Sequence, residues 1–242
     1  MEVRRVTSKD AGPAPAGWDE LAWPGLWAPL AAFALYFVAT LVIVTVVLGI
    51  QTGLTGQLPG TPSPGAQAWV TLASLVILGG VSLAMLSRHR GQGLRRVVSL
   101  GSKLRRADFV PVLVLLVLTI PTGLAIAYFL SLHQVNLDPE MGKFLTHPAG
   151  LVAALVGAPV AEELWLRGLL YGSLRRWGPW VAVVGTAVVS AAVHLQLAQS
   201  LSVLPGMLAL SWLRYRTGRL APCVVLHGLN NLWAVIVSFL AV

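Results

Sequence analysis

Five titratable side chains interrupt otherwise apolar stretches in the C-terminal part of the sequence: Glu162, Glu163, Arg167, His194 and His227. Carboxylates and imidazoles can bind and release protons, so this set is suited to proton transfer, either in a catalysed reaction or along a path through a membrane. If the stretches cross a membrane, each charged side chain costs about 2.5 kcal/mol or more. Their retention therefore indicates a functional site.

The spacing of the first three residues separates two carboxylates. Glu163 and Arg167 are four residues apart and can pair on one face of a helix, whereas Glu162 is turned by about 100° from Glu163. Arg167 can thus neutralise one carboxylate while the other, Glu162, stays free. Pro159 removes a backbone hydrogen bond three residues before Glu162 and is expected to open the helix to water.

A second polar stripe lies near the C-terminus. Cys223, His227 and Asn231 follow one another at i, i+4 and i+8, which places them on one helical face. We predict that His227 and Asn231 face the site. We expect Asn230 to serve packing or hydrogen bonding and Cys223 to be a small buried apolar residue.

The elements that carry these residues are membrane helices. Of 242 residues, 56% are hydrophobic and only 11% are charged, and the mean hydropathy is +0.77. These values exclude a soluble enzyme, a disordered chain and a coiled coil. We predict an all-α, polytopic transmembrane bundle of about seven spans. The expected spans are 28–50, 67–87, 110–132, 149–174, 180–198, 201–213 and 220–240.

The positive charges predict how these spans are oriented. Of the 17 Lys and Arg residues, 15 fall in the N-terminal tail and in alternate loops, one lies in an opposite loop (Lys143) and one lies inside a span (Arg167). This asymmetry places the N-terminus in the cytosol and the C-terminus outside. It also explains the net charge of +8 without nucleic acid as a partner. We expect a multi-pass protein in the plasma membrane of a bacterium.

Distances along the helices suggest that the polar residues meet. Counted from the cytosolic helix ends, Glu162 lies about 18 Å deep, His194 about 21 Å, Asn231 about 16 Å and His227 about 10 Å. The organisation that follows has three parts: a cytosolic tail (1–27), N-terminal transmembrane helices and loops (28–147) and a C-terminal catalytic region (148–242).

Other roles for these residues stay open at this point. Glu163 and Arg167 could form only a structural ion pair, and His194 alone could be an interhelical hydrogen-bond partner. A chain of Glu and His residues could also serve a proton-coupled transporter. The first three spans carry no Asp, Glu, Lys, Arg or His. This lack of charged residues and the absence of an internal repeat argue against transport.

The motifs resemble those of a known family. Glu162-Glu163-Leu-Trp-Leu-Arg167 is similar to the EExxxR motif of the CPBP intramembrane proteases, the CAAX protease and bacteriocin-processing group that includes the Ras-converting prenyl endopeptidases. His194 resembles the histidine of the second motif, and His227 with Asn231 resembles the HxxxN motif. The likeness covers about residues 148–240. Ser190 departs from it, because the second motif usually has phenylalanine four residues before its histidine.

This resemblance implies an intramembrane endopeptidase that acts on a membrane-anchored or prenylated protein or peptide, which we expect to be cleaved near the cytosolic side. It implies that Glu162 activates water with help from His194, that His227 and Asn231 stabilise the oxyanion, and that Glu163 and Arg167 support the site. Family members are named metalloproteases, so Glu162, His194 and His227 are also candidate zinc ligands. A non-catalytic bacteriocin self-immunity protein is a further alternative within the group.

Overall fold

The computed structural model describes residues 25–56, 61–88, 105–130 and 139–240, and in these ranges the chain is helical without any strand. The N-terminal elements are α1 (Trp27–Thr55), α2 (Pro64–Arg88), α4 (Arg106–Leu130) and the short α5 (Pro139–Thr146). One nearly continuous helical run follows, made of α6 (Pro148–Val152), η1 (Ala153–Gly157), α7 (Ala158–Glu163), η2 (Leu164–Leu170), α8 (Tyr171–Leu174) and η3 (Arg175–Trp177). The chain then continues through α9 (Pro179–Ala192), α10 (Leu197–Thr217) and α11 (Ala221–Leu240).

Five of these helical segments are long and apolar enough to cross a membrane. They are Trp27–Thr55, Pro64–Arg88, Arg106–Leu130, Pro148–Trp177 and Ala221–Phe239. Their outer faces carry many exposed Leu, Val, Ile and Phe side chains, as expected where lipid rather than water is the surrounding medium. The predicted all-α, multi-pass membrane architecture is therefore confirmed, and the count of seven spans is approximate.

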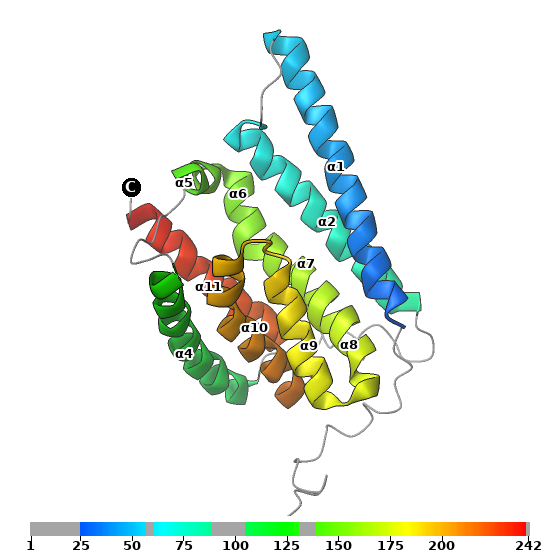
Figure 1. Ribbon diagram of the computed structural model, residues 1–242, viewed down its shortest axis with the longest axis vertical. Coiled ribbons are helices and arrows are strands. Elements are labelled where there is room, and N and C mark those ends of the chain that lie inside the picture. The colour runs from blue at the N-terminus through cyan, green and yellow to red at the C-terminus, as the bar shows by residue number, and fades with distance from the viewer. Residues whose placement is uncertain (1–24, 57–60, 89–104, 131–138, 241–242) are drawn as a thin grey trace, which may run out of the picture.

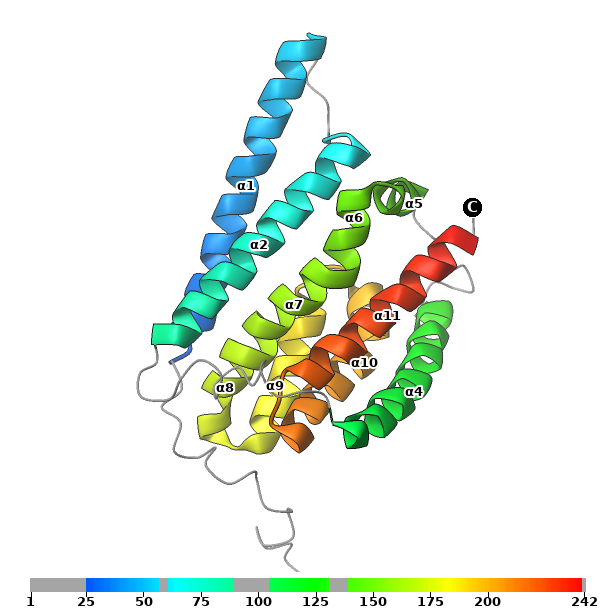
Figure 2. The same cartoon turned by 180° about the vertical axis from the view of Figure 1, so that it is seen from behind.

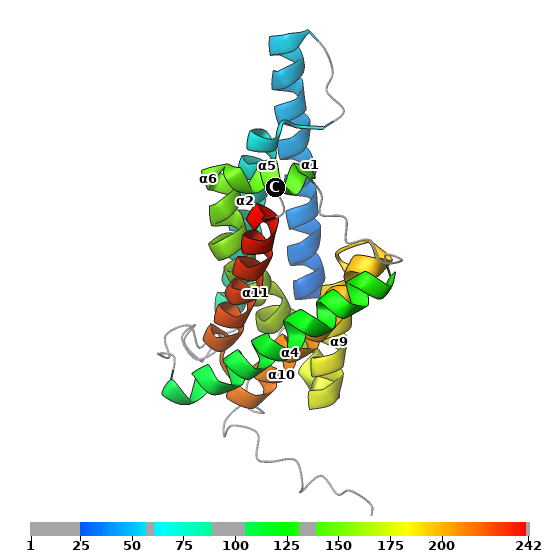
Figure 3. The same cartoon turned by 90° about the vertical axis from the view of Figure 1, so that its left-hand side faces the viewer.

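The helices form a bundle with two distinct ends. The beginning of α1, α8 and the turn between α10 and α11 lie at one end, and α5, the beginning of α6 and the end of α11 lie at the other (Figures 1 and 2). The distribution of Lys and Arg predicts that the first end is the cytosolic one. α4 crosses α10 and α11 at a steep angle (Figure 3).

The predicted fifth and sixth spans need correction. α9 ends at Ala192, and a turn separates it from α10, which begins at Leu197. The prediction of 180–198 extended the fifth span too far, because the residues after Ala192 are mostly apolar yet leave the helix. Pro205 lies inside α10 without ending it. The tip of this α9–α10 hairpin stops short of the level of α5 (Figures 1 and 3).

Two long-range contacts attach the N-terminal helices to the C-terminal ones. The indole Nε1 of Trp165 in η2 donates to the carbonyl of Pro29 in α1 at 2.9 Å, and Phe33 stacks on the same indole with ring centroids 4.9 Å apart. At the base of α4, Asp108 forms an ion pair with Arg219, which lies just before α11. The first contact ties the helical run that carries the predicted motif to α1, and the second ties α4 to the start of α11.

Candidate active site

The backbone around the two glutamates is not a regular α-helix. π-helical turns flank α7 on both sides, η1 before it and η2 after it. In η1 the N–H of Ala158 bonds to the carbonyl of Ala153, five residues back, and Pro159 has no N–H to donate. The carbonyl of Ala154 therefore lacks the helical donor that an α-turn (from Ala158) or a π-turn (from Pro159) would supply. Such single π-turns inside helices often occur at functional sites.

Asn231 of α11 supplies the missing donor. Its Nδ2 donates to the carbonyl of Ala154 at 2.8 Å. One predicted site residue is thus engaged in fixing the irregular turn that precedes Glu162, in addition to any contact with a reacting group through its second N–H. Gly228, one turn earlier on α11, also lies close to this region, and a Cβ there would be in ordinary van der Waals contact, 3.7 Å from the Leu155 carbonyl oxygen.

Replacing Asn231 with alanine is therefore expected to lower both stability and activity. The Ala154 carbonyl would lose its donor, which costs about 1–3 kcal/mol when the group is buried. Thermal unfolding in detergent and cleavage of a membrane-anchored peptide would measure the two effects, with Asn230→Ala as the matched control on the same helix. A loss of activity with unchanged unfolding temperature would contradict this positioning role and leave a role at the oxyanion alone.

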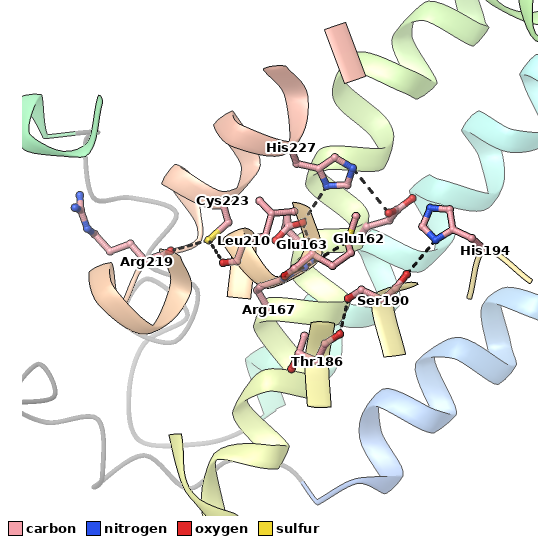
Figure 4. A network of polar contacts seen from close by, with 11 residues as sticks. Glu162, Glu163, Arg167, Thr186, Ser190, His194, Leu210, Arg219, Cys223 and His227 are labelled. Atoms are coloured by element: carbon pink, nitrogen blue, oxygen red, sulfur yellow. Dashed lines mark hydrogen bonds and ion pairs between the residues drawn. The ribbon is translucent and has the colours of Figure 1, made fainter. Parts of the chain in front are cut away.

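Glu163 is the centre of a buried charged cluster. Its side chain and that of Arg167 are both 0% exposed. The Oε1 atom accepts from Nη1 of Arg167 at 2.9 Å and contacts Nδ1 of His227 at 2.9 Å, as Figure 4 shows. Nη2 of Arg167 donates to the carbonyl of Met207 in α10 at 3.1 Å. The pairing predicted from the four-residue spacing is present, and the pair also holds the imidazole of His227.

The contact with Glu163 fixes the orientation of His227. Since the carboxylate accepts, Nδ1 carries a proton, an assignment that follows from the hydrogen-bond partner. The other ring nitrogen, Nε2, then points to Glu162, whose Oε2 lies 4.0 Å away. The site is a sequence of contacts from Arg167 through Glu163 and His227 to Glu162.

Glu162 differs from Glu163 in its surroundings. Its side chain is 35% exposed, and it lies at one end of a cavity of about 420 Å³, within the size range of small-ligand sites. The other lining residues come from α1, α2, α5 and the η1–α7 segment: Tyr36, Gln67, Thr71, Leu75, Phe144, Leu145, Ala153, Ala154 and Ala158. The reading of one paired and one free carboxylate agrees with this geometry.

His194 lies apart from the four-residue cluster. It follows α9 in the turn of the hairpin, and its Nδ1 contacts the carbonyls of Ser190 at 3.1 Å and Ala191 at 3.3 Å. These contacts leave Nε2 for other partners, and none of the hydrogen bonds among the described residues joins it to Glu162. Figure 4 shows the ring on the side of the cluster where Glu162 lies. The next residue, Leu195, has a φ of 62°, a strained conformation of the kind found at functional turns.

The three predicted zinc ligands, Glu162, His194 and His227, do not come together in this arrangement. Oε2 of Glu162 and Nε2 of His227 face each other, whereas His194 does not join them. Within the part of the chain that the structure describes, no three His, Cys, Asp or Glu side chains are grouped closely enough to hold a metal ion. As placed, these residues do not fit a three-ligand zinc site. The zinc triad stays a prediction.

The match to known families covers this same region. The sequence model of the family described as "Type II CAAX prenyl endopeptidase Rce1-like" matches residues 144–233. Residues 144–233 are thus similar to the Rce1-like family, and the match covers little more than a third of the 242-residue chain. The resemblance seen in the three motifs is thereby confirmed, and the family supports a peptidase. No curated protein and no solved structure matches the chain.

The Rce1-like segment contains all six predicted site residues, and the structure groups them unequally. Glu162, Glu163, Arg167 and His227 lie together, Asn231 borders them, and His194 stands at the hairpin turn. The sequence did not indicate the backbone carbonyls of Met207 and Ala154, which complete the cluster. Pro159 was the one usable signal, because a proline always leaves a carbonyl one turn earlier without its donor.

Proposed function

We propose that the protein is an intramembrane endopeptidase in which Glu162 activates the attacking water. The observation that carries the proposal is the contrast between the two adjacent glutamates. Glu163 is buried and engaged with Arg167 and His227, whereas Glu162 borders both a cavity and the unengaged nitrogen of His227. A substrate in the cavity would meet the free carboxylate.

The reaction needs one water and no other reagent. Hydrogen bonds of about 2.8 Å to both Glu162 Oε2 and His227 Nε2 are compatible with the 4.0 Å between these atoms. Glu162 takes a proton from this water as its oxygen bonds to the scissile carbonyl carbon. The same proton then passes to the leaving nitrogen as the C–N bond breaks, which restores the carboxylate.

The charge that develops on the carbonyl oxygen requires donors. Protonated His227 can donate from Nε2, because Glu163 balances its positive charge through Nδ1 and Arg167 holds Glu163 in place. The second N–H of Asn231 is a further candidate donor. His194 donates from Nδ1 to the Ser190 and Ala191 carbonyls, so its Nε2 can accept a hydrogen bond from the attacking water. Donors fixed inside a site that excludes bulk water stabilise such charge more than donors in water do.

The proposed substrate is a membrane-anchored or prenylated protein or peptide, and the proposed location is the plasma membrane of a bacterium. The family match supports a CAAX-type substrate by analogy. The function of a self-immunity protein would survive substitution of Glu162. A proton-coupled transporter would instead show proton or solute flux in liposomes that is lost on His194→Ala, so flux and cleavage measured together separate a transporter from a peptidase.

Identification of trapped substrates tests the proposal. Membranes carrying Glu162→Gln should retain intact peptides that membranes with the unsubstituted protein release as two fragments, and mass spectrometry of the bound material would identify them. Cleavage in H₂¹⁸O should place one ¹⁸O atom in the new carboxylate. Repeating the cleavage with a chelator tests the zinc prediction. Equal cleavage by the Glu162→Gln variant would refute the assignment of Glu162.

A further inference from the structure

Access to Glu162 is asymmetric along the helix that carries it. On the side that leads to the cytosolic end, every residue from Leu164 to Ser173 is buried. The indole of Trp165 and the side chains of Leu166 and Leu169 fill this region together with residues of α1 and α2. The described part of the protein is therefore tightly packed below the catalytic glutamate.

The cavity extends in the opposite direction. Gln67, Thr71 and Leu75 follow one face of α2, about 5, 11 and 17 Å from its first residue, and all three line the cavity. Phe144 and Leu145 of α5 also line it, and α5 lies at the end of the bundle opposite α8 (Figure 2). The cavity thus reaches from the level of Glu162 to the end that the charge distribution places outside the cell.

The lining indicates what can enter. Apart from Glu162 the cavity residues are uncharged, so a charged segment would be buried there without a partner, at considerable cost. Three alanines and three larger apolar side chains offer space for small and apolar groups. Gln67 uses its Nε2 to donate to the Pro62 carbonyl at 2.8 Å, which leaves its Oε1 as an acceptor for a backbone N–H. These features suit an extended, uncharged peptide.

We infer that the substrate enters Glu162's cavity from the extracytoplasmic side, as an uncharged segment of a protein anchored in or exposed on the outer half of the membrane. The inference rests on the proposed function for the cleavage itself. It differs from the cytosolic-side cleavage favoured by the sequence. Of the two substrate classes proposed above, it favours the membrane-anchored one over prenylated C-termini next to polybasic segments, because the latter bind the cytoplasmic leaflet.

Cysteine accessibility tests the direction of entry. The chain has a single cysteine, Cys223, which is buried, so a Cys223→Ala background is readily made. Thr71→Cys in this background should react with a membrane-impermeant maleimide in right-side-out vesicles and lose this labelling in inside-out vesicles. The modification should also block cleavage. Gln67→Cys, one turn nearer the first residue of α2, is the second variant if Thr71→Cys does not fold.

Two exposed positions report which side of the membrane faces the maleimide in each vesicle preparation. Thr55 is exposed at the end of α1, and Arg176 is exposed after α8, so Thr55→Cys should label from outside and Arg176→Cys from the cytosolic side. Labelling of both cavity variants from the cytosolic side, from both sides or from neither would overturn the inference, as would reversed reporters. The labelling pattern does not depend on catalysis. A Glu162→Gln variant that still cleaves would instead refute the proposed function and leave the direction of access standing.

Discussion

Replacing Glu162 with glutamine is expected to lower kcat/KM by about 10²–10⁴-fold, the usual contribution of a general base. Glutamine keeps the shape of the side chain but cannot accept the proton of the attacking water. The carboxylate is 35% exposed and its nearest ionic partner is 4.0 Å away, so the free energy of unfolding should change by no more than about 0.5 kcal/mol. Cleavage kinetics in proteoliposomes and thermal unfolding in detergent would measure the two quantities.

The variant Glu162→Asp tests whether the position of the carboxylate matters. It retains the base but withdraws it by one methylene group, so part of the activity should remain. Equal inactivity of the glutamine and aspartate variants would indicate that the reaction requires both the carboxylate and its position. Unchanged activity in both variants would exclude Glu162 from the reaction.

Replacing Arg167 with methionine is expected to cost about 3–5 kcal/mol in unfolding free energy, because it leaves the buried Glu163 carboxylate without its main counterion. Both side chains are 0% exposed, so water cannot compensate. Activity should fall as well, since Glu163 would no longer be held against His227. Thermal or chemical unfolding in detergent, with parallel cleavage assays, checks both effects.

The double variant Glu163→Gln/Arg167→Met separates stability from function. Removing both charges should restore most of the lost stability, because the uncompensated carboxylate is gone. Activity should stay low, because an uncharged glutamine supports a protonated His227 poorly. Arg176→Gln, exposed at the end of the same helical run, is the control and should change stability by no more than about 1 kcal/mol. Additive losses in the double variant would contradict the view that the pair is coupled.

The length of the apolar stretches was enough to predict the membrane helices. Each span must satisfy its own backbone hydrogen bonds in hydrocarbon, so a long apolar stretch has to be helical. Length alone was not enough for α9 and α10. The residues 193–196 that separate them include Val193 and Leu195, so hydropathy continues through a turn that only tertiary structure reveals. α5 was also absent from the prediction, since eight residues are too few to show a membrane pattern.

The side-chain chemistry of the site was predictable where it depended on spacing within one helix. Glu163 and Arg167 pair as their separation of four residues requires. The contact of Glu163 with His227 joins residues 64 positions apart. The depths predicted from the sequence, about 18 Å for Glu162 and about 10 Å for His227, indicated only that these residues could meet within the bundle. The attachment of Asn231 to the Ala154 carbonyl was not foreseeable, because it depends on a π-turn whose hydrogen-bond register the sequence does not display.

The short α9 has a consequence for the surrounding lipid. Its 14 residues extend over about 21 Å, whereas the hydrocarbon layer is about 30 Å thick. Lipid beside the hairpin must thin, or headgroups and water must descend towards the turn that carries His194. The thickness of the surrounding bilayer therefore affects how much water reaches the turn that carries His194.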